Sequence, residues 1–382
     1  MPRALRLIAF ISPIVATFGA GLSAFPGQAS VPAPPTDRSL VGWTPGAVRC
    51  GTSIVPGQPI RRPWNALAWG TPPSSDSITY RFDIDASGRP VSITREAPRF
   101  IPFAEDVGPA LAVSRFAPGA PQQGCTVTFT KWSSTLAQAD VIELMSYTVH
   151  PDAGVLPKPG WDRIRSVAGS CFDTPYPQPL VRRFPDFAAL PATPGVPSWS
   201  MIAYDLNAGG KPLRPRVFAG TGNAALDKAS LAAIRGSRFT RGARTGCFYP
   251  FRRAPAKLEA PAMPQATHDA KVEGGTCPDE HGWASPPQLR FSEPWRRRSI
   301  EGWAVISYDV ATWGELGNMK VIAAQPSSEF GEQAMNVLRT ARFAPSAQGY
   351  VGCVDRVKFV MGPENKSAIN DDGEGTPLPP AY

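Results

Sequence analysis

The chain has 382 residues, which is enough for two or three domains of ordinary size. Apolar residues make up 42% of the sequence and charged residues 18%, which excludes a chain without hydrophobic cores. Proline is unusually frequent, at 44 residues, and the formal net charge is +8. We therefore expect folded domains joined by turns, irregular coil and proline-rich linkers.

The N-terminus has the residue order of a secretory signal peptide. Two arginines precede an apolar run from Leu7 to Leu22, and small residues follow. The run is short and is interrupted by Pro13, so a bilayer-spanning helix is the weaker interpretation. We expect a signal peptide over 1–29, a tether over 30–44 and export to the periplasm. An uncleaved leader is the alternative, and it would give the protein a contact with the inner membrane.

The positive charge is gathered in short arginine clusters. An exported protein rarely meets nucleic acid, so the charge does not predict a nucleic-acid partner. Two interpretations of the clusters stay open, which are a solvated surface and attraction to acidic partner segments or anionic head groups. The clusters are Arg61-Arg62, Arg182-Arg183, Arg252-Arg253 and Arg296-Arg297-Arg298.

The six cysteines are regularly spaced and indicate an internal repeat. Taken in order they form three pairs, with separations of 75, 76 and 76 positions. Six cysteines permit fifteen pairings, and the equal spacing favours Cys50–Cys125, Cys171–Cys247 and Cys277–Cys353. Closing each loop would stabilise its module by roughly 4 kcal/mol in the chain-entropy model. No pair has C-x-x-C spacing, so we expect no metal site and no cofactor.

Three sequence windows between the paired cysteines share one pattern. A strand-like segment ends in an aromatic residue and Asp, and a glycine follows five positions later in a turn. An amphipathic helical pattern and an Arg-Phe pair come next, and alternating residues follow the second cysteine. The recurring residues are Phe82-Asp83, Gly88 and Arg115-Phe116; Tyr204-Asp205, Gly210 and Arg238-Phe239; and Tyr308-Asp309, Gly314 and Arg342-Phe343.

The pattern predicts an α+β fold made of three tandem small modules. Each module is strand, turn, strand, helix, strand (β-β-α-β), with one helix packed on an antiparallel sheet. The modules are expected over 45–131, 165–254 and 275–362, with a disordered tail over 363–382. Pro109 should kink or shorten the first helix, and Pro250 should place the last strand of the second module at a sheet edge or in coil.

The third module resembles the C-terminal domain of the TonB energy-transducer family. The resemblance covers about 70 residues. It consists of a basic approach to Gly302-Trp303, a strand that ends in Tyr308-Asp309, and a helix that ends in Arg342-Phe343-Ala344-Pro345. The first two modules match less, mainly through the hairpin and the helix with its Arg-Phe pair. The resemblance implies a periplasmic domain that takes part in transport across the outer membrane.

Domains of that family bind a short extended segment of an outer-membrane receptor by adding it to a sheet edge. The resemblance places this edge in the strand after the helix, at Arg356, Val357, Lys358, Phe359, Val360 and Met361. In the first module the corresponding strand is Cys125 to Thr130. Energy transducers of that family have an uncleaved membrane anchor and a long spacer. A cleavable leader and a short tether, as expected here, differ from that arrangement. The implied function is therefore binding of protein segments, and these departures leave transmission of force outside the prediction.

The sequence does not point to an enzyme. It has three histidines, none in H-E-x-x-H, and no G-x-S-x-G motif. The repeated aspartates stand where a carboxylate caps a turn, so we assign no catalytic residue. Two alternatives to segment binding remain. One is an envelope scaffold whose modules bind only each other, and the other is an enzyme that would depend on His281 or Asp309.

Overall fold

A computed structural model describes residues 37–55, 60–72, 76–97, 100–268, 271–278 and 282–362. The chain divides into two units, Met1–Pro35 and Thr36–Tyr382, and all described residues belong to the second. The expected signal peptide and the tail over 363–382 lie outside the described residues. Across the described ranges, no helix has both the length and the apolar character that a membrane crossing requires.

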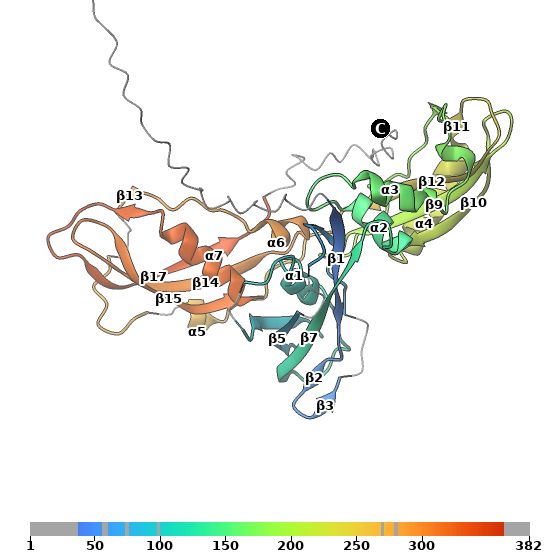
Figure 1. The fold of residues 1–382 in the computed structure, drawn as a ribbon. Helices are drawn as coiled ribbons and strands as arrows, with labels where there is room; N and C mark the ends of the chain where they lie inside the picture. The colour runs from blue at the N-terminus through green and yellow to red at the C-terminus, as the bar shows by residue number, and fades with distance from the viewer. Residues whose placement is uncertain are drawn as a thin grey trace, which may run out of the picture. The chain divides into compact units, whose positions relative to one another are not determined.

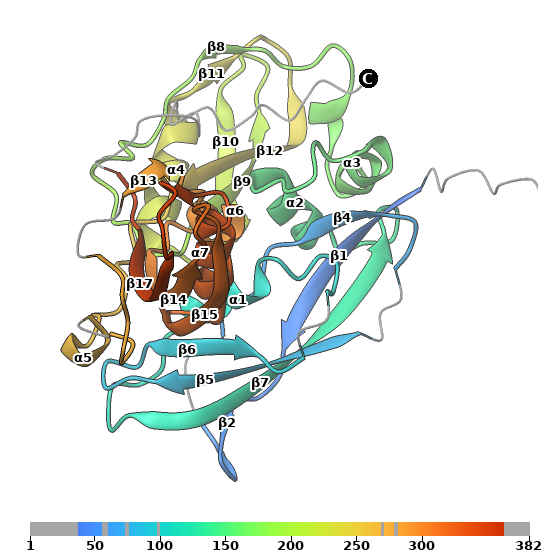
Figure 2. The ribbon, with the colours of Figure 1, turned by 90° about the vertical axis from the view of Figure 1, so that its left-hand side faces the viewer.

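The first module is an antiparallel sheet of seven strands with one short helix, α1. Its strands are β1 (Arg38–Pro45), β2 (Arg49–Cys50), β3 (Ser53–Ile54), β4 (Ala66–Trp69), β5 (Ser77–Ile84), β6 (Pro90–Arg95) and β7 (Gln122–Thr135), and α1 spans Val107–Ala112. Figure 2 shows β6, β5 and β7 side by side. As Pro109 predicts, α1 is only six residues long.

The expected tether is wrong in its second half, because β1 belongs to the sheet. Leu40, Val41 and Trp43 of this strand are buried. The strand pairs with β4 on one side and with the far half of β7 on the other. Apolar side chains on both faces of β1 drive this burial. The strand was hidden in the sequence because a proline-rich segment precedes it. The module therefore extends from 38 to 135 rather than from 45 to 131.

Two further helices, α2 (Val141–Val149) and α3 (Lys158–Arg165), lie between the sheet of the first module and that of the second. The Asp140 side chain caps α2 by accepting the backbone N–H groups of Ile142 and Glu143. Pro157 and Pro159 do not prevent α3, since proline is tolerated in the first turn. Both helices contribute to a core that also contains Leu40 of β1 and Met201 of the second module.

The second module has a three-stranded antiparallel sheet in the order β10-β9-β12. Its elements are η1 (Ser170–Phe172), β8 (Pro179–Val181), β9 (Ser198–Leu206), β10 (Pro212–Gly220), α4 (Ala224–Gly236), β11 (Arg238–Phe239) and β12 (Arg244–Arg253). Strand β9 is buried on both faces: Ile202 and Tyr204 lie in the core with α4, and Met201 and Ala203 lie in the core with α2 and α3. Pro250 is accommodated because β12 is an edge strand.

The third module has the same sheet order, β15-β14-β17, with α7 packed on β14 and β15 (Figure 1). Its elements are β13 (Trp283–Ser285), α6 (Glu293–Arg297), β14 (Gly302–Val310), β15 (Leu316–Gln325), α7 (Ser328–Leu338), β16 (Arg342–Phe343) and β17 (Tyr350–Phe359). A short helix, α5 (Gln265–His268), precedes them. The expected α+β class with small antiparallel sheets is confirmed.

The same backbone hydrogen bonds occur at corresponding places in all three modules. In each module the backbone N–H of the phenylalanine in the Arg-Phe pair donates to the carbonyl of the turn glycine. These bonds join Phe116 to Gly88, Phe239 to Gly210 and Phe343 to Gly314, at 2.9–3.0 Å. All three glycines have positive φ, which explains why glycine stands there in each copy. The helix is thus tied to the hairpin in the same way each time.

The first and third modules share one hydrophobic core. The cluster contains Ile93 and Leu111 from the first module with Trp295 and Phe330 from the third. The backbone N–H of Ile93 donates to the carbonyl of Pro326, at 2.9 Å. A buried ion pair adds to this contact, because both Arg298 Nε and Nη2 lie 2.5 Å from the carboxylate oxygens of Asp106.

Candidate binding sites at two sheet edges

Strand β17 is the last strand of the third module and lies at an edge of its sheet. It pairs with β14 along one side, in a register that sets Lys358 opposite Trp303 and Phe359 opposite Gly302. No other strand of the described residues pairs with it. Phe359 is fully buried against Phe291 and Phe330, with ring centroids 5.7 and 5.3 Å away. These rings hold the strand on the core while its second long edge stays without a strand partner.

The residues predicted for the binding edge do not all lie in β17. Arg356 to Phe359 belong to the strand, and Val360 and Met361 follow its end. The Val360 side chain is exposed, and the backbone N–H of Met361 donates to Glu301 Oε1 at 2.8 Å. Lys358 is exposed, whereas Phe359 points into the core. The edge available to a ligand therefore consists of Val354 to Phe359, with Lys358 as its most solvent-accessible side chain.

The beginning of β17 is covered by the segment that carries the first cysteine. The backbone N–H of Thr276 donates to the carbonyl of Val351 at 2.9 Å, and the N–H of Val351 donates to Thr276 Oγ1 at 3.0 Å. The Cys277–Cys353 disulfide fixes this segment beside the strand. All three disulfides join the pairs that the spacing favours, and such bonds indicate an oxidising compartment.

The corresponding strand of the first module is not an edge, so the expectation for Cys125 to Thr130 is wrong. These residues lie in β7, which pairs with β5 on one side and with β1 and β2 on the other. Thr130, for example, is opposite both Ser77 and Thr44. The strand became central because β1 and β2 add to the sheet in this module alone. A segment cannot be added to β7 at this place.

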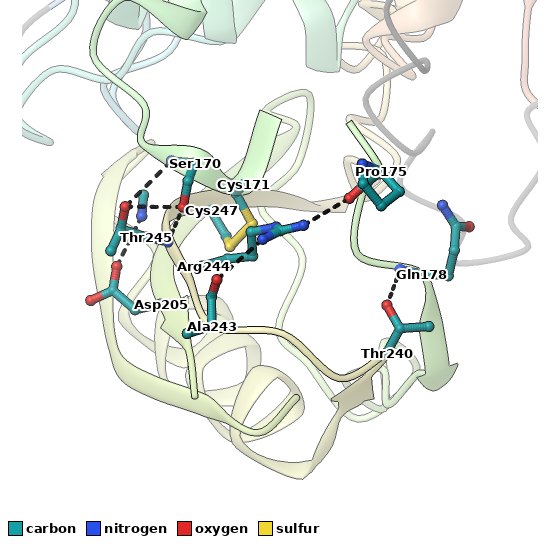
Figure 3. Close-up of a disulfide and its surroundings, with 11 residues drawn as sticks. Ser170, Cys171, Pro175, Gln178, Asp205, Thr240, Ala243, Arg244, Thr245 and Cys247 are labelled. Atoms are coloured by element: carbon teal, nitrogen blue, oxygen red, sulfur yellow. Dashed lines mark hydrogen bonds between the residues drawn. A yellow bond between two sulfur atoms is a disulfide. The ribbon is translucent and has the colours of Figure 1, made fainter. Parts of the chain in front are cut away.

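The second module has an edge strand and, next to it, a pocket with a volume of about 340 Å³. Its lining is mostly apolar, and it includes seven aromatic residues, the two cysteines of the disulfide and two arginines. The lining includes Pro179, Arg182, Arg183, Tyr204, Phe239, Tyr249 and Phe251. Figure 3 shows the Cys171–Cys247 disulfide with the loop that leads from it to Gln178.

Two hydrogen bonds hold that loop in place. Arg244 Nη2 donates to the carbonyl of Pro175 at 3.0 Å, and the backbone N–H of Gln178 donates to Thr240 Oγ1 at 3.0 Å (Figure 3). Burial raises the pKa of the Tyr204 hydroxyl, so that this group stays a neutral phenol at physiological pH. The Arg182 guanidinium lies over the Tyr249 ring, 5.6 Å from its centroid. The pocket is thus apolar inside and positively charged at Arg182 and Arg183.

Comparison with known proteins identifies the third module. The family model described as Gram-negative bacterial TonB protein C-terminal matches residues 287–360. Residues 287–360 are a TonB C-terminal domain. The solution NMR structure of the Pseudomonas aeruginosa TonB CTD is similar to 24% of this chain and to 98% of that chain, with 17% sequence identity and a TM-score of 0.21. A search of the curated proteins finds no match.

The TonB C-terminal domain match contains the edge strand but not the whole module. Cys277 and Trp283 precede the matched residues, although the first forms the disulfide to β17 and the second packs on Phe343. Sequence reasoning predicted the cysteine from its spacing. For Trp283 it favoured packing in a core or at a module interface, without indicating Phe343 as the partner.

The aspartate considered for catalysis has a structural role. Asp309 Oδ1 accepts the backbone N–H of Gly352 at 2.9 Å, and Oδ2 accepts from Asn318 Nδ2 at 2.7 Å. The Asn318 and Gly352 bonds lower the pKa of Asp309, so the carboxylate stays charged. Asp83 and Asp205 accept from Gly124 and Gly246 in the same way.

The remaining candidates for chemistry are not brought together in a site. His281 lies outside the described residues, so the structure does not place it. Within the ranges that the structure describes, no three His, Cys, Asp or Glu side chains come together as a metal site would require. The family whose model matches residues 287–360 is not an enzyme family.

Proposed function

We propose that the protein is exported to the periplasm and binds an extended segment of another protein at the free edge of β17. An outer-membrane receptor is the partner that fits the TonB C-terminal domain best. The observation that carries the proposal is the edge position of β17, which among the described residues has a strand on one side only. An added strand would gain main-chain hydrogen bonds to β17, and neighbouring side chains would select its sequence.

The chemistry of the edge supports this choice. Lys358 and Val360 are exposed, and Arg356 lies two positions from Lys358 in the same strand. In a strand, alternate side chains point to the same face, so the two cationic residues lie on one face of β17. A segment with acidic residues at alternate positions would meet this face with complementary charge. The open stretch from Val354 to Phe359 offers room for about six residues of a ligand.

Photo-crosslinking at one pair of equivalent positions tests the proposal. Lys358 and Thr130 lie five residues after Cys353 and Cys125, and both side chains are exposed. We expect a photoreactive residue at Lys358 to form an adduct with an outer-membrane protein in cells. The same residue at Thr130 should form none, because β7 is paired on both sides.

The adduct should contain a short segment of the partner, identified by mass spectrometry. That segment, as a synthetic peptide, should slow hydrogen exchange of the β17 backbone amides. The proposal would be contradicted if both positions formed adducts in equal yield. It would also be contradicted if neither position formed an adduct with an outer-membrane protein. The N-terminal residue of the mature protein tests the export step separately, because cleavage should leave a chain that starts near Phe25 or Ser30.

A scaffold is the second candidate, and the shared core of the first and third modules favours it. A protein whose modules bind only each other would use its edges internally, as β6 does where Ile93 donates to Pro326. The recurring hydrogen bonds and disulfides support the further proposal that all three modules descend from one unit. The crosslinking experiment separates the two candidates, since a scaffold alone gives adducts within the chain and none with a receptor.

A further inference from the structure

The second and third modules build the same small strand pair but fill the space beside it differently. In the third module β13 pairs with β16, which sets Trp283 opposite Phe343. In the second module β8 pairs with β11, which sets Pro179 opposite Phe239. Phe343 and Phe239 are equivalent, because each donates its N–H to the turn glycine of its own module. Trp283 and Pro179 therefore occupy the same place in the fold.

An indole ring fills this place in the third module. The Trp283 and Phe343 rings lie 4.3 Å apart, and Tyr308 lies 6.3 Å from Phe343 on another side. In the second module the Tyr204 ring lies 5.6 Å from the Phe239 ring, but no indole of the described residues stacks on Phe239 there. Pro179, Phe239 and Tyr204 instead line the pocket of about 340 Å³. The pocket is the space that the protein's own tryptophan fills in the neighbouring module.

The charge of the pocket adds a second requirement. Arg182 and Arg183 line it, and within the described residues neither guanidinium forms an ion pair with a carboxylate. Arg182 is half-buried over the Tyr249 ring, so part of its hydration is already lost. A carboxylate beside a bound aromatic ring would form charge-assisted hydrogen bonds with these two groups.

The surroundings favour a protein segment as the source of that ring. Tyr249 and Phe251 of the lining belong to β12, which is an edge strand, so an extended backbone can lie beside it. The chain next to the lining residues exposes an apolar run in which Leu180, Val181 and Phe184 have 66%, 42% and 39% of their surfaces exposed. Such a run beside a pocket is typical of a surface that binds another protein.

We propose that this pocket binds an aromatic side chain, with an acidic residue next to it, from a segment of a partner protein. The site is independent of β17, because it lies in a different module and outside the TonB C-terminal domain. The ring takes the place that Trp283 occupies in the third module. The acidic residue pairs with Arg182 and Arg183.

Binding of a fluorinated amino acid to the full-length, disulfide-bonded protein tests the chemistry first. The probes are N-acetyl-5-fluorotryptophan and its neutral amide, observed by fluorine NMR. We expect the acid to bind with a dissociation constant on the order of 0.1–1 mM, as for a fragment of this size. The amide should bind about tenfold more weakly, because it lacks the carboxylate. Equal affinity of the two probes would overturn the charge requirement and with it the proposal.

Two variants and a matched control locate the site. Pro179→Trp should supply the missing indole, in the place that Trp283 occupies in the third module, and so abolish binding of both probes. Arg182→Gln with Arg183→Gln should remove only the preference for the acid, and this variant keeps the test valid if Pro179→Trp does not fold. Arg216→Gln, an exposed arginine on the opposite edge strand β10, should change nothing. Undiminished binding by a folded Pro179→Trp protein would overturn the proposal.

Peptides then distinguish a protein segment from a free aromatic acid. An acetylated pentapeptide Gly-Asp-Trp-Asp-Gly should bind at least as tightly as the amino acid, and its Asn-Trp-Asn counterpart about tenfold more weakly. Binding of the amino acid without binding of the peptide would overturn the assignment to a protein segment. Sedimentation should show a monomer, and a dimer that Pro179→Trp dissociates would instead assign the pocket to a second copy of the chain.

Discussion

The first and third modules contain the same hairpin, glycine turn and disulfide, yet their last strands differ in what they can bind. Strand β7 lies inside a seven-stranded sheet, whereas β17 lies at the edge of a three-stranded sheet. The difference arises outside the repeated elements, because β1 and β2 precede the hairpin of the first module and add to β7. Local hydrogen bonds thus define the module, and the flanking chain decides which of its edges stays open.

Removing a disulfide should have the largest effect, and the two modules should respond differently. Loops of 75 and 76 residues predict a similar loss, about 4 kcal/mol, for Cys50→Ser with Cys125→Ser and for Cys277→Ser with Cys353→Ser. In the first module Cys50 stays paired with Cys125 through the backbone of β2 and β7. In the third module the segment around Thr276 should detach, which would lengthen the open edge of β17.

Denaturant unfolding and hydrogen exchange of the amides check this prediction. Exchange should increase at Val351 in the third-module variant and stay slow at Thr126 in the first-module variant. Equal exposure of both strands would mean that the sheet around β7 adds no protection beyond its disulfide.

The buried ion pair between the two modules should have the next largest effect. Arg298 is 2% exposed, and its guanidinium has a bidentate contact with the carboxylate of Asp106. Asp106→Asn should lower the free energy of unfolding by about 3 kcal/mol, because it leaves a buried charge without its partner. The double variant Asp106→Leu with Arg298→Met should lose much less. A double-mutant cycle in urea would measure the coupling, and no coupling would mean that the contact between these modules is weak in solution.

The sequence predicted the repeated part of this fold well, for a physical reason. Each copy carries the same glycine because its turn needs positive φ, and the same Asp because a backbone N–H needs an acceptor. Cysteine spacing likewise predicted the three bonds, since equal spacing in a repeat favours equal pairing. These signals are local, so they survive in the sequence even where the copies have diverged.

The sequence could not predict which edges were open or where a pocket formed. The open edge of β17 and the closed edge of β7 depend on pairing with β1, a strand that resembles a tether in the sequence because prolines surround it. The pocket depends on a difference between Pro179 and Trp283, which becomes visible only when β8 and β13 are found in equivalent places. Both features are set by contacts between distant segments.

Opening the equivalent space in the third module should have a smaller effect on stability. Trp283→Ala removes a half-buried indole from Phe343, so we expect a loss of about 2 kcal/mol, below the 3–5 kcal/mol typical of a fully buried tryptophan. The variant should also gain a site for the neutral N-acetyl-5-fluorotryptophan amide, because prolines stand after Trp283 where the second module has Arg182 and Arg183. Fluorine NMR would detect it, and a stable variant that binds no probe would show that the space collapses.

Counted per pH unit, the smallest effect should be a dependence of stability on pH at the junction of the modules. The His150 ring is stacked on Trp64 with centroids 5.2 Å apart, and the Arg298 guanidinium lies over the same indole, 4.5 Å from its centroid. Burial, with the nearby charges of Arg252, Arg298 and Arg297, lowers the pKa of His150 to about 3. The unfolded chain therefore binds a proton near pH 6.5 that the folded protein binds only near pH 3.

Stability should accordingly fall as the pH is lowered from about 6.5 towards 3, by up to about 1.4 kcal/mol per pH unit from this group. Carboxylates that accept hydrogen bonds, such as Asp309, lose stabilisation at the lower end of the same range, so a matched variant is needed. His150→Phe keeps a ring on Trp64 but cannot bind a proton. Its urea unfolding curves should depend less steeply on pH between about 6.5 and 4 than those of the wild type. Identical slopes would mean that His150 is protonated in the folded protein, and that the arginines around Trp64 lie further from it than in this structure.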